Sequence, residues 1–254
     1  MTQKLTFRQQ LRAGHRLFGT FFKTPAYQLV EVLGGADLDF IVIDAEHASF
    51  DRAALDVCLL AARSSQLPAL VRVQSTIESH ILDALDLGAS GIVAPHARNA
   101  ECVRKIISAA RYRDGSRGFS NSPRAGGYGT TSMQAHIAAS DRDNAIVCQI
   151  EDREAVEDIH AIAAIDEADC LFIGRADLAV SYGTYDVEHP TVKTAVQIVC
   201  DAGKAKGKSV GIHVSSVKEM QTYLAMGVTM FIVSSEQAVL RTAFADMAQK
   251  FRSA

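Results

Sequence analysis

Two acidic residues follow apolar runs of the sequence and could bind one metal ion. Glu151 closes the run Ala145–Ile150, and Asp177 lies four residues beyond the run Cys170–Ile173. Each run predicts a buried strand, and neighbouring parallel strands bring their carboxyl ends to the same edge of a sheet. Two carboxylates at that edge are suitable ligands for a hard divalent cation. Taken singly, Glu151 also fits the acidic first turn of a helix, and Asp177 fits a helix N-cap.

Other predicted strands also end in polar residues, which include cations, imidazoles and carboxylates. They are Asp44, Glu46, His47, Arg72, Gln149, Arg175, His213, Ser234, Ser235 and Glu236. Arg72 ends an apolar run and therefore needs an anionic partner, and it could neutralise charge developing on a substrate oxygen. His47 could transfer protons near neutral pH, although a lone histidine is more often an ordinary loop residue. The set favours a small anionic oxo acid whose carbonyl is polarised by a metal.

A Schiff-base mechanism would instead require a lysine in a dry part of the same site. Lys23 alone follows a predicted strand, and Thr24 and Pro25 predict an exposed turn there. We therefore favour metal chemistry over a covalent lysine adduct. His213 could line the site or simply pack. Asp86 lies in a predicted helix, where the residues alone indicate a solvated helix face.

Apolar runs and helical stretches alternate along the whole sequence. Eight strands are predicted at Leu17–Phe21, Phe40–Asp44, Ala69–Arg72, Gly91–Ala94, Ala145–Ile150, Cys170–Ile173, Ser209–His213 and Met230–Ser234. Predicted helices include Arg52–Arg63, Ile77–Leu87, Ala100–Arg111, Arg153–Ala163, Thr191–Lys206, Val217–Met226 and Glu236–Phe251. The alternation predicts an α/β fold with a parallel sheet, and eight units match a (β/α)₈ TIM barrel in one domain, residues 1–254. A doubly wound sheet is disfavoured because no glycine-rich turn follows the first strand.

The segment Tyr112–Thr131 is the only long stretch with no predicted helix or strand. Irregular segments of this length in compact domains are usually functional or mobile. We expect it on the face of the barrel that carries the strand carboxyl ends. There it could cover the site or reach a neighbouring subunit.

The composition excludes several other classes of protein. The net charge is −3, and the basic residues form no run, which argues against nucleic-acid binding. The sequence has no signal peptide and no apolar run long enough to cross a bilayer, so we expect a cytoplasmic protein without a membrane partner. The five cysteines are widely spaced, and Cys58, Cys148 and Cys170 lie in apolar runs. They predict reduced core thiols.

The sequence resembles the HpcH/HpaI aldolase family, the metal-dependent class II pyruvate aldolases that include 4-hydroxy-2-oxoheptanedioate aldolase. The resemblance spans nearly the whole chain, and its most specific parts are the Asp-x-Glu-His and Gly-x-Ala-Asp-Leu segments. Its carriers are Val42–His47, Val71–Val73, Leu85–Gly88, Gly91–Pro95, Arg117–Gly118, Gln149–Glu151 and Phe172–Leu178. It implies a (β/α)₈ barrel of the phosphoenolpyruvate/pyruvate type, commonly found in hexamers that exchange the last helix between subunits.

The resemblance also implies roles for individual residues. Glu151 and Asp177 look like the ligands of a divalent ion, Mg²⁺, Mn²⁺ or Co²⁺. Arg72 is similar to the arginine that stabilises the pyruvate enolate, and His47 is similar to the acid/base residue. The resemblance also implies that Asp86 is the carboxylate partner of His47, and that Asp44 and Glu46 bind water or contact the site indirectly. The residues that it implies for substrate binding are Gln149, Gly174, Ala176 and Asp177.

Two features depart from the family pattern. Arg175 stands where many family aldolases have proline, and an added cation there could favour a more acidic substrate or perturb the metal site. The segment Phe119–Gly129 also differs, in a region where the resemblance places the aldehyde part of the substrate. Both features concern the identity of the substrate more than the class of reaction.

The expected activity is reversible cleavage of a 4-hydroxy-2-oxo acid to pyruvate, or a related 2-oxo acid, and an aldehyde, by a homo-oligomer (hexamer or trimer). Two alternatives stay open. One is a CoA-thioester lyase of the citrate lyase beta or malyl-CoA type, in which Arg113, Arg117 and Arg124 would bind CoA phosphates. The other is a barrel that binds oxo acids without turnover.

Overall fold

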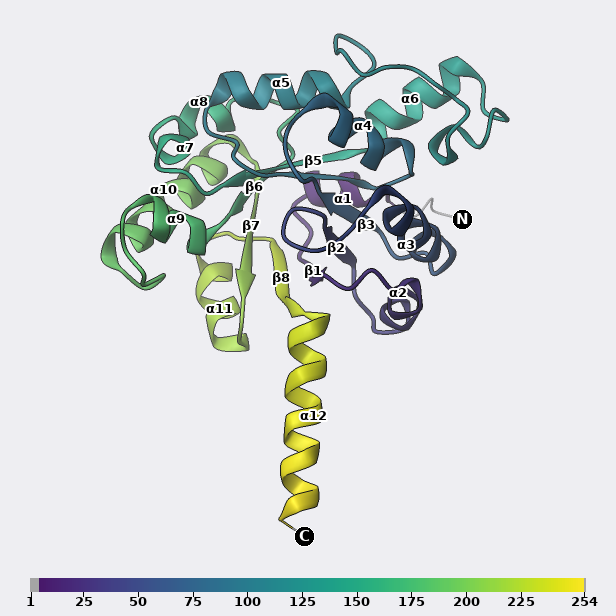
Figure 1. Cartoon of the computed structure of the whole chain (residues 1–254). Coiled ribbons are helices and arrows are strands. Elements are labelled where there is room, and N and C mark those ends of the chain that lie inside the picture. The colour runs from purple at the N-terminus through teal and green to yellow at the C-terminus, as the bar shows by residue number, and fades with distance from the viewer. Residues whose placement is uncertain (1–4, 254) are drawn as a thin grey trace.

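Eight parallel strands form a closed barrel in the computed structural model, which describes residues 5–253 (Figure 1). The strands are β1 Leu17–Phe22, β2 Phe40–Asp44, β3 Ala69–Arg72, β4 Gly91–Ala94, β5 Ala145–Ile150, β6 Cys170–Ile173, β7 Ser209–Val214 and β8 Met230–Ser235. Each strand pairs with its neighbours in the sequence, and β8 pairs with β1 to close the barrel. The predicted TIM barrel and the positions of its eight strands are confirmed.

Helices surround the barrel and connect its strands. They are α1 Phe7–Arg12, α2 Tyr27–Gly34, α3 Arg52–Ser64, α4 Glu78–Asp86, α5 Ala100–Ala110, α6 Met133–Asp143, α7 Arg153–Glu157, α8 Ile159–Ala163, α9 Arg175–Ser181, α10 Pro190–Lys206, α11 Val217–Ala225 and α12 Glu236–Arg252. A short 3₁₀ turn, η1, spans Arg124–Gly126. None of the described helices combines the length and the apolar character needed to cross a membrane.

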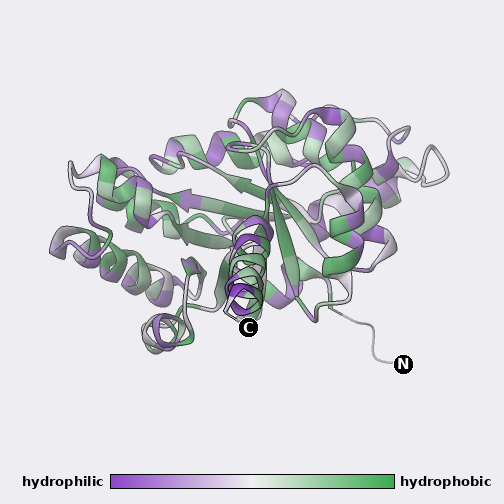
Figure 2. Cartoon of the chain, turned by 60° about the horizontal axis from the view of Figure 1, so that its bottom comes forward, coloured by the Kyte–Doolittle hydropathy of each residue, from purple (hydrophilic) through white to green (hydrophobic). Residues whose placement is uncertain are grey.

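The strands are apolar on both faces because each face packs against other side chains. In β2, Phe40 and Val42 belong to the core inside the barrel, whereas Ile41 and Ile43 pack outward against the helices. This alternation follows from the two-residue period of a strand, and two buried faces explain the continuous apolar runs in the sequence. Figure 2 shows the strands mostly in the hydrophobic colour. Among the cysteines, Cys58, Cys148, Cys170 and Cys200 are buried free thiols.

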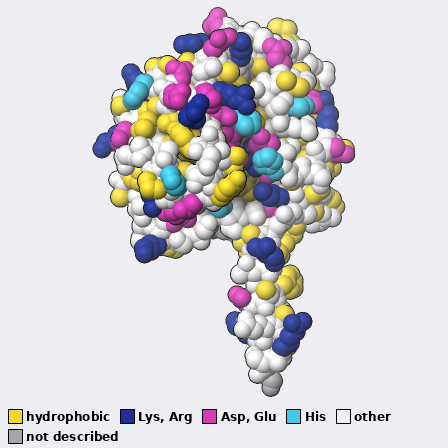
Figure 3. All heavy atoms as spheres, turned by 60° about the vertical axis from the view of Figure 1, so that its left-hand side comes forward, with side chains coloured by type: hydrophobic (Ala, Val, Ile, Leu, Met, Phe, Trp, Pro, Cys, Tyr) yellow, Lys and Arg dark blue, Asp and Glu magenta, His cyan; other side chains and the backbone are white. Residues whose placement is uncertain are grey.

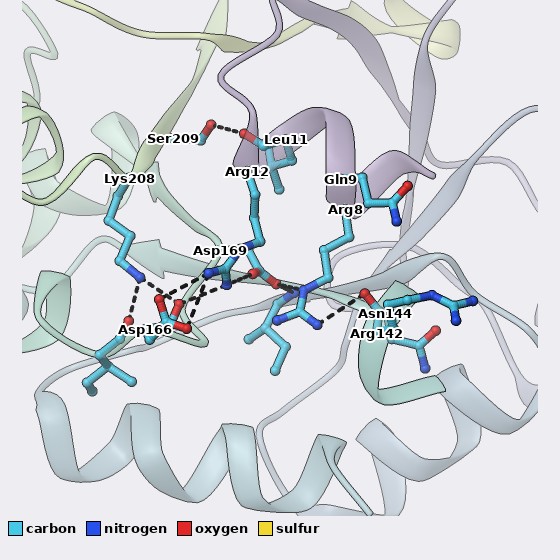
Figure 4. Close-up of polar contacts among 12 residues, drawn as sticks. Arg8, Gln9, Leu11, Arg12, Arg142, Asn144, Asp166, Asp169, Lys208 and Ser209 are labelled. Carbon is cyan, nitrogen blue, oxygen red and sulfur yellow. Dashed lines mark hydrogen bonds and ion pairs between the residues drawn. The ribbon is translucent and has the colours of Figure 1, made fainter. Parts of the chain in front are cut away.

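Helix α1 closes the end of the barrel where the strands begin, through ion pairs around Asp169 (Figure 4). The Asp169 carboxylate accepts hydrogen bonds from Arg8 Nε at 2.8 Å, Arg12 Nη1 at 3.0 Å and the Ile146 backbone N–H at 2.9 Å. Arg111 Nη2 lies 3.9 Å from the same carboxylate. Burial lowers the pKa of Arg111 to about 10, and the nearby charge of Arg8 adds to the decrease. Asp169 therefore joins α1 to the barrel floor.

The segment Tyr112–Thr131 lies at this same end of the barrel, so its predicted place over the strand carboxyl ends is wrong. The segment follows α5, and a helix in a βαβ unit returns the chain to the end where strands begin. Arg117 donates from Nη2 to Asp86 Oδ1 at 2.8 Å and from Nη1 to Ser140 Oγ at 2.8 Å. Arg124 donates to the Leu87 carbonyl at 3.2 Å. The segment cannot cover the carboxyl-end face of its own barrel.

Helix α12 extends away from the barrel instead of packing along it, and the chain's C-terminus lies at its far end (Figure 1). Glu236 in its first turn is its only residue that is buried, among those described. Large apolar side chains stay exposed along its length: Val239, Leu240, Phe244, Met247 and Phe251. An apolar stripe on a protruding helix is typical of a surface that packs against another chain.

Replacing Asp169 with alanine should destabilise the barrel strongly, because it leaves the Arg8 guanidinium and the Ile146 N–H buried without their acceptor. We expect the free energy of unfolding to fall by about 3–5 kcal/mol, measured by urea denaturation. The control is Asp143→Ala, which removes the partner of the largely exposed Arg142 and should cost about 0.5 kcal/mol or less. Equal losses in the two variants would contradict this assignment.

Candidate active site

A cavity of about 550 Å³ opens at the carboxyl ends of the strands. Residues from six of the eight strands and their following turns line it, which is the usual place for a TIM-barrel active site. The lining residues include Phe21, Lys23, Arg72, Gln149, Gly174, Arg175, Ala176, Asp177, His213, Ser215, Ser234 and Ser235. Figure 3 shows acidic, basic and histidine side chains gathered around a hollow on one face of the barrel.

Glu151 is a buried carboxylate at the end of β5, with only 3% of its surface exposed. Its Oε1 accepts a hydrogen bond from the His96 backbone N–H at 2.8 Å, and its Oε2 accepts one from the Gln149 side-chain amide. Burial raises the pKa of Glu151, and the negative charge of Asp177 adds to this rise, whereas the two hydrogen bonds oppose it. The carboxylate is thus held in place but incompletely compensated in charge.

Asp177 lies in the first turn of α9 and lines the same cavity. Between the two acidic residues, Gly174 keeps the approach open: a Cβ atom there would lie 2.9 Å from Glu151 Cβ and 3.1 Å from its Oε2. Gln149 contributes a further oxygen, because its buried Oε1 has no hydrogen-bond partner among the described residues. Two carboxylates and an unsatisfied amide oxygen are the ligand types of a hard divalent cation. The residues therefore fit a divalent metal ion.

His96 is a site residue that the sequence reasoning missed. It follows β4 in the left-handed region, with φ of +51°, and its Nδ1 lies 3.0 Å from Asp152 Oδ2 and 3.5 Å from Glu151 Oε1. Burial lowers the pKa of His96, but the hydrogen bond to Asp152 and the charge of Glu151 outweigh this effect and raise it. One ligating atom from each of these three residues could surround a metal ion. The rule that singled out the other strand ends applies equally to β4 and would have found His96.

Arg72 has the anionic partner that its place in an apolar run predicts. Its Nε and Nη2 donate to the two carboxylate oxygens of Asp44 at 3.0 Å and 2.7 Å. Burial raises the pKa of Asp44, but the hydrogen bonds and charge of Arg72 outweigh burial, and the pKa is lowered. Lys23 Nζ lies 3.3 Å from Asp44 Oδ2, and Glu46 Oε2 lies 3.4 Å from Arg72 Nε. Asp44 therefore fixes the orientation of the Arg72 guanidinium.

His47 and Asp86 do not meet within one chain. The His47 side chain is 57% exposed, and its Nε2 lies 3.7 Å from Glu46 Oε2, whereas its backbone N–H donates to Asp44 Oδ1 at 3.1 Å. Asp86 is the last residue of α4, at the opposite end of the barrel, where it accepts the hydrogen bond from Arg117. The implied pairing of Asp86 with His47 is therefore wrong for a single chain, because α4 carries Asp86 away from the strand carboxyl ends.

Arg175 lines the cavity, but its charge is already paired. It donates to the Glu219 carboxylate, to the Tyr223 hydroxyl at 2.9 Å and to the His213 carbonyl at 3.1 Å. Its guanidinium also lies over the Tyr223 ring, 5.2 Å from the centroid. The structure thus gives Arg175 a role in joining α9 to β7 and α11. It is not the added free cation that the sequence suggested.

With this geometry, the chain can be compared with known proteins. A profile of the HpcH/HpaI aldolase/citrate lyase family matches residues 17–243. The 5-keto-4-deoxy-D-glucarate aldolase of Enterobacter sp. (strain 638) is 34% identical over 224 residues, which cover 87% of this chain and 87% of that protein. The chain therefore belongs to the HpcH/HpaI aldolase/citrate lyase family and is an enzyme of the lyase class.

Solved structures agree with this assignment. A HpcH/HpaI aldolase/citrate lyase family protein from Burkholderia cenocepacia J2315 superposes with a TM-score of 0.91 at 30% identity, covering 96% of this chain and 98% of that one. The citrate synthase SbnG superposes with a TM-score of 0.88 at 26% identity, covering 98% and 99% of the two chains. The same barrel thus serves relatives with different reported reactions.

The titration of His213 tests the arrangement around Arg175. Burial lowers the pKa of His213 below 6.5, and the Arg175 charge adds to the decrease, whereas Glu219 opposes it. Protonation then favours the unfolded chain, so this group reduces stability as the pH falls below 6.5. Arg175→Met should raise the His213 pKa, because it removes a positive charge and leaves Glu219 unpaired. NMR titration of the imidazole measures the change.

The control for this titration is Lys105→Met on the far helix α5, where the lysine pairs with Glu101. It removes one positive charge from the protein without changing the surroundings of His213. A His213 pKa that is unchanged or lower in Arg175→Met would contradict the described electrostatics.

Proposed function

We propose that this chain is a divalent-metal-dependent aldolase that reversibly cleaves a 4-hydroxy-2-oxo acid to pyruvate, or a related 2-oxo acid, and an aldehyde. The observation that carries the proposal is the buried Glu151 carboxylate, which accepts a hydrogen bond from Gln149 and lies close enough to Asp177 for its charge to be felt. Gln149, Asp177 and Arg72 line one cavity. The aldolase relatives support the same class of reaction.

Different residues would bind the metal ion and the substrate carboxylate. Glu151 and Asp177 would hold the cation, with Gln149 Oε1 as a further oxygen beside it. A bound Mg²⁺, Mn²⁺ or Co²⁺ would supply Lewis-acid polarisation of the 2-oxo carbonyl. The backbone around Gly174 and Ala176 lines the cavity where the substrate carboxylate would lie. Gly174 is required there because a side chain would collide with Glu151.

Arg72 and His47 would carry out the charge and proton transfers. His47 takes the proton from the 4-hydroxyl, directly or through a water molecule, and the bond between carbons 3 and 4 breaks to release an aldehyde. The electrons remain on the pyruvate part as an enolate, whose oxygen Arg72 stabilises. Asp44 keeps the guanidinium in a fixed orientation through two hydrogen bonds. Protonation of carbon 3 then gives pyruvate.

The CoA-thioester lyase remains the second candidate, because the family profile and several solved neighbours carry citrate names. Two of the three arginines that suggested it are already paired within the chain. Arg117 is bound to Asp86 and Ser140, and Arg124 is bound to Asp56 and Leu87, at the end of the barrel opposite the cavity. The non-catalytic barrel is less favoured, because acidic, basic and imidazole groups share one site.

We also propose that the chain forms a homo-oligomer, a hexamer or trimer, in which α12 packs on a neighbouring copy. The protruding helix leaves Leu240, Phe244 and Phe251 exposed to solvent in a single chain. Near the base of α12, Val233 of β8 and Val217 of α11 are also exposed. Burial of these apolar surfaces between copies would stabilise the assembly.

Metal removal tests the proposed reaction. Complete chelation should abolish pyruvate release from a panel of 4-hydroxy-2-oxo acids, and Mg²⁺, Mn²⁺ or Co²⁺ should restore it. Glu151→Gln should lower activity about a hundredfold or more, because it removes one negative charge from the metal site. The control is Glu154→Gln on the exposed face of α7. Activity without metal, or trapping of the enzyme by borohydride, would reject the mechanism.

Light scattering after size-exclusion chromatography tests the assembly. Phe244→Glu should shift the protein to a smaller species, because it places a charge in the apolar stripe of α12. Gln249→Glu is the matched control, because it adds the same side chain on the opposite face of the helix. A monomeric wild-type protein, or an unchanged oligomer in Phe244→Glu, would refute the role of α12.

A further inference from the structure

Three cationic side chains line the cavity: Arg72, Arg175 and Lys23. The two arginines are hydrogen-bonded to partners in the protein. Arg72 donates two hydrogen bonds to Asp44, and Arg175 binds the Glu219 carboxylate and two further oxygens. Their side chains are 7% and 10% exposed. These hydrogen bonds fix the positions of both guanidinium groups.

Lys23 differs from both arginines. Its side chain is 31% exposed, and its Nζ makes one ion pair, at 3.3 Å, with Asp44 Oδ2. Within residues 5–253, its ammonium group donates no hydrogen bond that meets normal geometry. An ammonium group has three donors, so those of Lys23 remain available to a bound molecule. Asp44 carries a single charge that two cations share, which leaves Lys23 only partly neutralised.

The backbone of Lys23 is held in place by Glu236, the first residue of α12. Glu236 is buried, and its carboxylate accepts hydrogen bonds from the Lys23 N–H at 2.9 and 3.0 Å and from the Thr24 N–H at 2.7 Å. Gln237 adds a hydrogen bond to the Thr24 hydroxyl at 3.1 Å. A buried carboxylate that binds a turn backbone fixes its position at the cavity rim. The turn is therefore held by hydrogen bonds, with Thr24 half-buried and Pro25 exposed.

The ring of Phe21 gives Lys23 and Arg72 a common support. Arg72 Cζ lies 4.7 Å from the ring centroid, and Lys23 Nζ lies 5.7 Å from it. Cations at these distances are attracted by the ring face. The ammonium group is thus close to the guanidinium that would stabilise the enolate, but nearer the open rim of the cavity. A substrate bound at Arg72 would extend toward Lys23.

We propose that Lys23 is a specificity-determining residue of the aldolase proposed above, and that it binds a carboxylate on the aldehyde part of the substrate. Glu236 acts as a positioning residue through the backbone of Lys23. A carboxylate fits better than a phosphate, because Asp44 and Glu46 lie close by and would repel a doubly charged group. The proposal rests on the proposed function, and it adds the residue that selects the aldehyde.

Two aldehydes of equal length test this proposal in the addition direction with pyruvate. Succinic semialdehyde ends in a carboxylate, and butanal ends in a methyl group. For Lys23→Met we expect the ratio of kcat/KM for succinic semialdehyde to that for butanal to fall about tenfold or more, mainly through KM. Lys23→Arg should restore part of the ratio. Lys218→Met, which removes an exposed lysine from α11, is the control and should match wild type.

Glu236→Gln provides a second variant that keeps Lys23 itself. Glutamine offers one acceptor oxygen to the two N–H groups that Glu236 now binds, so the turn should loosen. We expect the same ratio to fall, but less than in Lys23→Met. Circular dichroism and thermal unfolding establish that both variants are folded before the kinetics are compared.

Exchange of the pyruvate methyl hydrogens in D₂O separates failure of this proposal from failure of the proposed function. Exchange requires enolate formation but no aldehyde. A wild-type protein that shows no metal-dependent exchange would overturn the proposed function. Normal exchange in the wild type with an unchanged ratio in Lys23→Met would overturn only the role of Lys23. A loss of exchange in Lys23→Met as large as the loss of addition would place Lys23 at the enolate and also overturn the specificity role.

Discussion

The site depends on the electrostatic cost of burying the Glu151 carboxylate at the rim of the barrel. A buried carboxylate is costly unless hydrogen bonds and an opposite charge compensate it. Glu151 receives hydrogen bonds from the His96 N–H and the Gln149 amide, but Asp177 adds a second negative charge to the same cavity. A divalent cation would satisfy both carboxylates at once. Strand β5, the turn after β4 and the first turn of α9 hold Glu151 and Asp177 in an arrangement in which their negative charges are not fully neutralised.

The cations of the site are distinguished by what already binds them. Arg72 is held by Asp44 in one orientation. A fixed guanidinium is suited to stabilising negative charge on a single substrate oxygen. Arg175 is joined to Glu219 and Tyr223 and supports the wall of the cavity. The Lys23 ammonium group makes one ion pair, with Asp44, and its turn is fixed by the first residue of α12. The helix that protrudes from the barrel therefore also holds the turn that carries Lys23 into the cavity lining.

Much of the fold follows from the sequence, because parallel strands buried on both faces are continuous apolar runs. The predicted bounds of β2 to β6 are those of the structure, and β1, β7 and β8 extend one residue further. The predicted helix Arg153–Ala163 is divided at Asp158 into α7 and α8. The helices α1, α2, α6 and α9 were not predicted, since they are short or only weakly amphipathic. The segment Tyr112–Thr131 lies where the strands begin because α5, which precedes it, returns the chain to that end of the barrel. The prediction from the sequence placed it at the other end, as if it directly followed a strand.

The residues after strands β3, β5 and β6 were predictable from the sequence. Arg72, Gln149 and Asp177 line the cavity, and Glu151 is hydrogen-bonded to Gln149 beside it. Only the family resemblance pairs Asp86 with His47, and no property of the segment around Asp86 places it near that histidine. His96 follows β4 and is a strand-end residue like the others, but its contact with Asp152 and that of Lys23 with Glu236 join distant parts of the sequence. Those contacts cannot be inferred from local patterns.

Diffraction from a crystal soaked with Mn²⁺ and pyruvate, recorded at the manganese absorption edge, tests whether Glu151 and Asp177 hold the metal ion. We expect an anomalous peak that contacts carboxylate oxygens of both residues at about 2.0–2.2 Å, with pyruvate between this peak and Arg72. A manganese ion bound only by His96 and Asp152, or pyruvate bound away from both carboxylates in an active protein, would contradict this assignment.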